Sequence, residues 1–212
     1  MTNVAHLASS LFQAFARELP QAGDDRLRAS CVDALLGAAR GEAALTDALG
    51  EPHEAPGCVQ LQLEELGRPK PEHAAARFGA FYEALLGLSR DPGSLDRRRR
   101  GAHFTPEPLA DRLAFAALNG VSAAPRAIDP AMGSGVLLGA IIQWLFREKG
   151  LEPDDIVKLI YGVDRDPIAV VLAREALGRL LVSLGASRET VASALHRQLV
   201  VGDATLDATA PP

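Results

Sequence analysis

The chain has 212 residues, of which 48% are hydrophobic and 23% charged, a globular balance that argues against disordered, collagen-like and coiled-coil proteins. Its formal net charge of −5 provides no overall basic field, so any DNA contact must come from a local patch. Cys31 and Cys58 lie far apart without a CxxC, which argues against a disulfide framework or structural zinc and favours a reducing cytoplasm. No apolar stretch reaches the roughly 18 residues of a membrane span, so no membrane partner is expected.

The first part of the chain, residues 1–90, is predicted to be a helical region, because its apolar residues recur at steps of three and four. The expected helices cover residues 4–19, 24–39 and 71–86. Residues 50–56 are predicted to be a loop from their glycine and proline content, and residues 58–66 fit either a strand or a helix.

A basic linker is predicted at residues 91–101, where the helical periodicity stops. It contains four consecutive arginines, Arg97, Arg98, Arg99 and Arg100. Such a run can contact DNA phosphates without sequence preference, but it more often only stays solvated.

From residue 102 to the end, predicted helices and strands alternate. Thr105 is expected to cap a helix that has Pro106 in its first turn and buries Leu109, Leu113 and Leu118. Strands are then expected at 127–129, 160–164 and 198–202, and helices at 136–146 and 167–184. This alternation predicts an α/β domain with a parallel sheet, whose ligands bind at the carboxyl ends of the strands.

Each predicted strand ends in or just before an aspartate, namely Asp129, Asp164 and Asp203. The turn after Asp129 contains Gly133 and Gly135, which let the backbone approach a ligand closely. An acid before such a turn suits a ligand cation, an acid on the next strand end suits a ribose diol, and the third suits an adenine amine. Ammonium, ribose and adenine together describe S-adenosylmethionine.

Other interpretations of these residues remain open at this point. The spacing of Gly133, Gly135 and Gly139 is also typical of a dinucleotide loop, although Asp129 would repel a pyrophosphate. Asp164 could cap the following helix, but Asp166 suits that role better. Asp203 is about as consistent with an ordinary turn aspartate. The five histidines have no metal-ligand spacing, so no metal is expected.

Three ordered motifs resemble those of adenine-specific DNA methyltransferases. Residues 101–106 read G-A-H-F-T-P, residues 129–135 read D-P-A-M-G-S-G, and residues 161–167 read Y-G-V-D-R-D-P. The similar family patterns are G-x-F/Y-F/Y-T-P, D-P-A-C-G-S-G and Y-G-x-D-x-D-P, found in large restriction-modification and phage-defence enzymes such as type I modification subunits and type IIG-like enzymes. The resemblance covers residues 78–203 and makes no claim on residues 1–70.

The resemblance implies a Rossmann-like, class I methyltransferase fold over residues 102–212 and S-adenosylmethionine as the cofactor. Its implied contacts are Phe104, Thr105 and Pro106 at the methionine end, Asp129, Pro130, Ala131, Gly133 and Gly135 around the amino acid moiety, Asp164 at the ribose, and Asp203 and Ala204 at the adenine. Met132 stands where the family has Cys, and His103 where many members have an aromatic residue.

The resemblance also implies what this chain lacks. The family's catalytic motif, Asp/Asn-Pro-Pro-Phe/Tyr/Trp, is not found, because Pro211 and Pro212 follow Ala210 and no aromatic residue comes after them. We therefore expect a cofactor-binding portion with little turnover of its own, whose DNA substrate and second chain, or specificity or nuclease subunit, belong to a complete enzyme. The alternatives are a non-catalytic cofactor-binding or assembly module, or a methyltransferase acting on protein or RNA.

Overall fold

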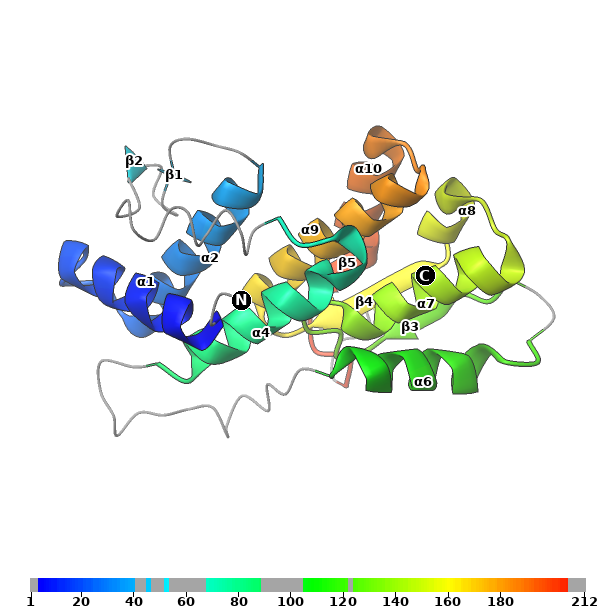
Figure 1. Cartoon of the computed structure of the whole chain (residues 1–212), viewed down its shortest axis with the longest axis horizontal. Coiled ribbons are helices and arrows are strands. Elements are labelled where there is room, and N and C mark those ends of the chain that lie inside the picture. The colour runs from blue at the N-terminus through cyan, green and yellow to red at the C-terminus, as the bar shows by residue number, and fades with distance from the viewer. Residues whose placement is uncertain are drawn as a thin grey trace. The chain divides into compact units, whose positions relative to one another are not determined.

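The computed structural model describes residues 4–40, 45–46, 52–53, 68–88, 105–121 and 124–205 (Figure 1). The protein is mixed α/β, mostly helical, with one small three-stranded parallel sheet. Contacts divide it into two compact units, the first comprising Met1–Pro69 and Ala80–His103 and the second Lys70–Gly79 and Phe104–Pro212. Helix α4 (Ala74–Leu86) therefore has residues in both. No helix in the described ranges combines the length and apolarity needed to cross a membrane.

The first unit is helical, as the periodicity predicts. Helix α1 (Val4–Glu18) packs against α2 (Asp24–Arg40), and both end within one residue of the predicted limits. The buried face of α1 carries the apolar residues spaced by three and four, Leu7, Ala8, Leu11, Phe12 and Phe15. Cys31 of α2 is buried, and burial raises the pKa of its thiol because the thiolate would lose its hydration.

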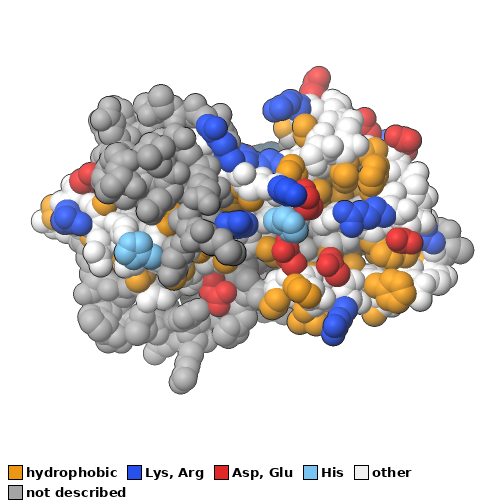
Figure 2. All heavy atoms as spheres, viewed as in Figure 1, with side chains coloured by type: hydrophobic (Ala, Val, Ile, Leu, Met, Phe, Trp, Pro, Cys, Tyr) orange, Lys and Arg blue, Asp and Glu red, His pale blue; other side chains and the backbone are white. Residues whose placement is uncertain are grey.

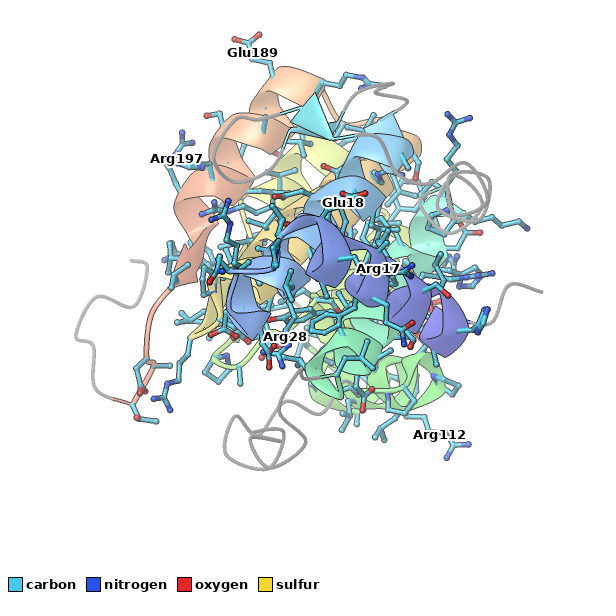
Figure 3. The ribbon with its side chains drawn as sticks, turned by 90° about the vertical axis from the view of Figure 1, so that its left-hand side faces the viewer. Arg17, Glu18, Arg28, Arg112, Glu189 and Arg197 are labelled. Atoms are coloured by element: carbon cyan, nitrogen blue, oxygen red, sulfur yellow. The ribbon has the colours of Figure 1, made fainter. Side chains whose placement is uncertain are left out.

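Arg28 joins α2 to the last turn of α4 within the first unit. Its guanidinium is buried and donates to the carbonyl oxygens of Leu85 (3.3 Å) and Leu88 (2.7 Å) and to the Asp25 carboxylate (2.8 Å) (Figure 3). The carbonyls at a helix C-terminus have no partners within the helix, so this guanidinium supplies hydrogen bonds to them. Its positive charge also interacts favourably with the negative end of the helix dipole.

Two short strands lie between α2 and α4. β1 (Leu45–Thr46) pairs antiparallel with β2 (Pro52–His53). The loop prediction for residues 50–56 is therefore wrong at Pro52 and His53, and the ladder is only two residues long in each strand, consistent with the missing N–H of proline. Residues 58–66 lie outside the described ranges, so neither interpretation of them is tested.

The second unit contains the parallel sheet in the order β3-β4-β5. The strands are β3 (Ala127–Asp129), β4 (Ile160–Asp164) and β5 (Leu199–Val201). The helices of this unit, beside the start of α4, are η1 (Pro71–His73), α6 (Glu107–Leu118), α7 (Val136–Lys149), α8 (Pro153–Val157), α9 (Pro167–Leu184) and α10 (Arg188–Gln198). Helix α7 contacts β3, and α9 contacts β4 and β5. The strand, helix and strand alternation predicted from the sequence is confirmed.

Two helices of the second unit were not predicted. Helix α10 follows Ser187, whose hydroxyl accepts from the Thr190 amide at 3.5 Å. The helix ends at Gln198, which was predicted to begin the last strand. The last strand is consequently shorter than the predicted 198–202. Helix α8 is a single turn that Pro153 begins.

Of the three leucines predicted to be buried on helix α6, Leu118 is buried and the other two are exposed. Leu109 and Leu113 are 48% and 45% exposed, and the residues that face inward are Ala110, Ala114 and Leu118. Small side chains at steps of four let α6 approach α7 closely, which explains why alanines rather than leucines occupy the contact. The N-cap is Pro106 rather than Thr105, and no side chain caps the helix.

Candidate ligand site

The carboxyl edge of the sheet brings two of the predicted aspartates together. Asp129 is the last residue of β3 and lies in register with Gly162, and Asp164 is the last residue of β4. Because side chains alternate along a strand, Asp164 leaves the same face of the sheet as Gly162 and therefore as Asp129. Both carboxylates thus lie at one edge and on one face.

The turn between β3 and α7 is bound to both carboxylates. The Ala131 amide donates to Asp129 Oδ1 at 3.1 Å, and the Gly133 amide donates to Asp164 Oδ2 at 2.8 Å. Gly133 has φ +54° and Gly135 has φ +85°, left-handed values that favour glycine. The other Asp164 oxygen, Oδ1, accepts from the Asp166 amide at 2.9 Å. Asp164 therefore holds the turn and the start of the next connection at the same time.

The electrostatics of Asp129 favour a positively charged partner. Burial raises the pKa of this carboxyl, the Ala131 N–H partly offsets that effect, and the nearby charge of Asp164 raises the pKa further. A cation placed beside Asp129 would relieve both unfavourable effects.

Close packing leaves no room for a side chain at two glycines, Gly135 at the end of the turn and Gly162 in β4 beside it. A Cβ atom on Gly135 would lie 3.1 Å from Leu177 Cδ1, so this glycine also lets α7 begin directly against α9. A Cβ atom on Gly162 would overlap Met132 Sδ and lie 3.1 Å from both Leu138 Cδ1 and Leu199 Cδ2. Met132, which is larger than the Cys of the similar family pattern, therefore fills the space above Gly162.

Ser134, between the two glycines, is a polar residue that the sequence interpretation did not single out. It is 0% exposed, and its Oγ has no hydrogen-bond partner. A buried hydroxyl without a partner is unfavourable, so Ser134 lowers the stability of the turn. Its sequence signal is its position between Gly133 and Gly135.

Asp203 differs from the prediction, because it lies two residues beyond β5 instead of at its end. Its Oδ1 accepts from the Thr205 amide at 3.0 Å and from Thr205 Oγ1 at 2.6 Å, and its Oδ2 lies 3.3 Å from Arg165 Nε. These contacts are those of a turn aspartate, the alternative that the sequence left open, and its carboxylate is already engaged. Arg165, which no sequence pattern had indicated, is the residue that links the two strand ends.

The remaining predicted residues fall into three groups. Thr105 is partly buried before α6, and the residues exposed in turns or at the helix start are Pro106, Pro130, Ala131 and Ala204. Asp166 caps α9 by accepting from the Ile168 amide at 2.9 Å, which confirms its expected role. Phe104, Arg97, Arg98, Arg99 and Arg100 lie outside the described residues. Within the described ranges, no group of three metal-ligating side chains is close enough to hold a metal ion.

Comparison of the chain with protein-family models, curated proteins and solved structures finds no match. The site offers one carboxylate whose surroundings favour a cation, a second carboxylate with lone pairs beyond its two amide contacts, and a backbone turn that a ligand can approach.

Proposed function

We propose that this chain is the cofactor-binding portion of an S-adenosylmethionine-dependent, adenine-specific DNA methyltransferase with a Rossmann-like fold. The observation that carries the proposal is the position of Asp129 and Asp164 on one face at the carboxyl edge of the parallel sheet. Both accept from the turn after β3, Asp129 from the Ala131 amide and Asp164 from the Gly133 amide. Ligands of open α/β sheets bind at that edge.

The groups at the edge suit two parts of the proposed cofactor. Asp129, whose pKa is raised by burial and by the Asp164 charge, would hold the ammonium of the amino acid moiety. Asp164 would accept from the ribose hydroxyls while keeping its bonds to Gly133 and Asp166. The adenine end is less well supported, because three of the acceptor sites of Asp203 are already used by Arg165 and Thr205.

S-adenosylmethionine, when bound, supplies an electrophilic methyl group on a sulfonium. The role proposed for this chain is to bind and orient that group, which is a positioning role without a general base. The 212 residues contain no Asp/Asn-Pro-Pro-Phe/Tyr/Trp motif, so the groups that would receive a flipped adenine are proposed to belong to a complete enzyme with DNA as its substrate. A restriction-modification or phage-defence role is part of the same proposal.

Titration calorimetry with two ligands tests whether Asp129 holds the ammonium and Asp164 the ribose. S-adenosylmethionine carries the ammonium, ribose and adenine, whereas 5′-methylthioadenosine lacks the amino acid moiety. Asp129→Asn is expected to weaken the binding of S-adenosylmethionine about tenfold, the equivalent of 1.4 kcal/mol, and to leave the affinity for methylthioadenosine unchanged. Asp164→Asn is expected to weaken the binding of both ligands. Glu189→Gln, which removes an exposed charge from α10, is the matched control (Figure 3).

Two results would contradict the proposal. A folded chain that binds neither ligand has no cofactor site, which would favour an assembly module. Binding of a nicotinamide dinucleotide in preference to S-adenosylmethionine would restore the dinucleotide interpretation of the glycine turn. In the structure the third glycine of that interpretation, Gly139, lies inside α7, where its added Cβ would be 3.6 Å from Leu177 Cδ2.

A further inference from the structure

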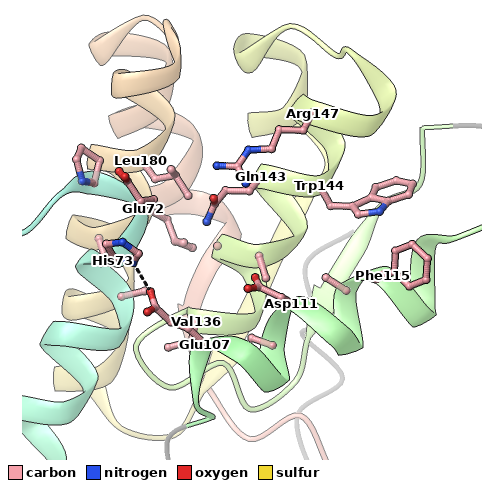
Figure 4. Close-up of a pocket in the computed structure, with 18 of the residues that line it drawn as sticks. Glu72, His73, Glu107, Asp111, Phe115, Val136, Gln143, Trp144, Arg147 and Leu180 are labelled. Carbon is pink, nitrogen blue, oxygen red and sulfur yellow. Dashed lines mark hydrogen bonds and ion pairs between the residues drawn. The ribbon is translucent and has the colours of Figure 1, made fainter.

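A groove of about 480 Å³ lies on the helical side of the second unit, lined by residues of η1, α4, α6, α7 and α9 (Figure 4). Its volume falls in the about 300–1,000 Å³ range of ligand pockets. None of the strand-end aspartates lines it. The groove is therefore a candidate binding site that the proposed cofactor does not use.

The floor of the groove is apolar and made largely of small residues. It includes Ala110 and Ala114 of α6, Gly139 and Ala140 of α7, and Ala176 of α9. Small side chains leave the depth of the groove open, so an occupant can bury aliphatic groups against it. At one end lie the rings of Phe115, which is 56% exposed, and Trp144, whose buried Nε1 has no hydrogen-bond partner.

The rim of the groove carries polar side chains that use few of their bonding groups. His73 Nδ1 and Glu107 Oε1 lie 3.0 Å apart across η1 and α6. The other polar rim residues, for which the structure gives no hydrogen bond or ion pair, are Glu72, Asp111, Gln143, Arg147 and Glu148. Figure 4 shows Gln143 and Arg147 directed into the groove from α7, with Glu72 and Asp111 on other sides.

The charges of the rim select a basic occupant. Glu72, Glu107, Asp111 and Glu148 face a single guanidinium, that of Arg147, together with the imidazole of His73. Lysine and arginine side chains suit such a surface, because their stems can lie on the apolar floor while their charged heads reach the carboxylates.

The unpartnered Arg147 and Gln143 distinguish a peptide from a simple polyamine. Both side chains have N–H donors that can donate to carbonyl oxygens, and a peptide backbone supplies such acceptors. A protonated polyamine offers only donors and leaves both side chains without an acceptor. We propose that this groove binds a short segment of another protein that alternates basic and aliphatic residues.

Fluorescence of Trp144 tests the proposal directly, because it is the only tryptophan of the chain. The probe is an acetylated and amidated hexapeptide of alternating lysine and leucine, and the comparison ligands are the alternating glutamate and leucine peptide and spermidine. We expect a saturable change in emission with the lysine peptide alone. The Glu72→Gln/Asp111→Asn double variant is expected to bind it more weakly by up to about thirtyfold, since two exposed ion pairs with lysines are lost.

The control is the double variant Asp155→Asn/Glu189→Gln, which removes the same charge from exposed positions outside the groove and should keep the parent affinity. The proposal is overturned if the lysine peptide gives no saturable change, if spermidine or the glutamate peptide binds equally well, or if the two double variants lose affinity equally. Circular dichroism of each variant confirms that it is folded before the titration is interpreted.

Discussion

At the scale of single residues, the charge of Asp129 makes the stability of the fold depend on pH. Burial and the Asp164 carboxylate raise the pKa of Asp129 above its ordinary value of 3.8, so the folded protein binds the proton more tightly than the unfolded chain. As pH rises from that ordinary value through the raised one, the folded state must accept a charge that it disfavours, and the free energy of unfolding falls.

Asp129→Asn removes that charge and keeps an oxygen that can accept from the Ala131 amide. We expect the variant to be more stable than the parent at pH 7.5, with the difference shrinking toward pH 4 as the parent carboxyl takes up a proton and loses its charge. Thermal unfolding followed by circular dichroism at both pH values measures this. A variant that is less stable at pH 7.5 would show that the charged hydrogen bond to Ala131 outweighs burial.

Gly162 and Met132 form a second pair whose coupling can be measured. A Cβ atom at position 162 would overlap the Met132 sulfur and crowd Leu138 and Leu199 at 3.1 Å. Gly162→Ala should therefore destabilise the second unit by about 1–3 kcal/mol, as overpacking does. Adding Met132→Cys, which shortens the obstructing side chain, should recover part of the loss. Denaturant unfolding followed by Trp144 emission reports on this unit.

Gly139→Ala is the control for this pair, because its added Cβ would meet Leu177 Cδ2 at an ordinary 3.6 Å inside helix α7. Alanine in a helix interior is favoured over glycine by about 1 kcal/mol, so this variant should be neutral or more stable. If Gly162→Ala and Gly139→Ala had equal effects, close packing above Gly162 would not be the cause. An unchanged loss in the double variant would show that the leucines, and not Met132, set the limit.

At the scale of elements, the sequence predicted those parts whose signals are local. The strands at Ile160–Asp164 and Ala127–Asp129 and the helix Pro167–Leu184 have the predicted limits, because glycines, prolines and aspartates mark their ends. Gly150, with φ +61°, ends α7 just beyond its last basic residue. In these cases the residue types themselves restrict the backbone.

The predictions that were wrong at this scale concern features that depend on a neighbouring element. Periodicity on α6 is satisfied by either the leucine or the alanine face, and only the close approach to α7 selects Ala110 and Ala114. Helix α10 ends at Gln198 and so shortens the last strand, which leaves Asp203 in a turn. The groove on the helical side likewise has no sequence signature, because its lining comes from four separate segments.

At the scale of the whole molecule, hydrophobic side chains of the described residues reach the surface unevenly. The large ones that are exposed all lie in the second unit: Leu109, Leu113, Phe115, Ile128, Val171 and Val201. On the face drawn in Figure 2, hydrophobic groups lie among charges of both signs. Exposed apolar groups beside an unpaired strand are favourable positions for association between copies of a chain.

β3 provides such a strand, because among the described strands it pairs with β4 alone and its Ile128 is 52% exposed. We therefore expect concentration-dependent self-association in analytical ultracentrifugation, reduced about tenfold by Ile128→Lys, which places a charge on that edge at an equivalent cost of 1.4 kcal/mol. Val171→Lys, at an exposed position on α9, should leave the association unchanged. Sedimentation of the parent as a monomer at every concentration, or equal effects of the two substitutions, would show that the β3 edge does not drive association.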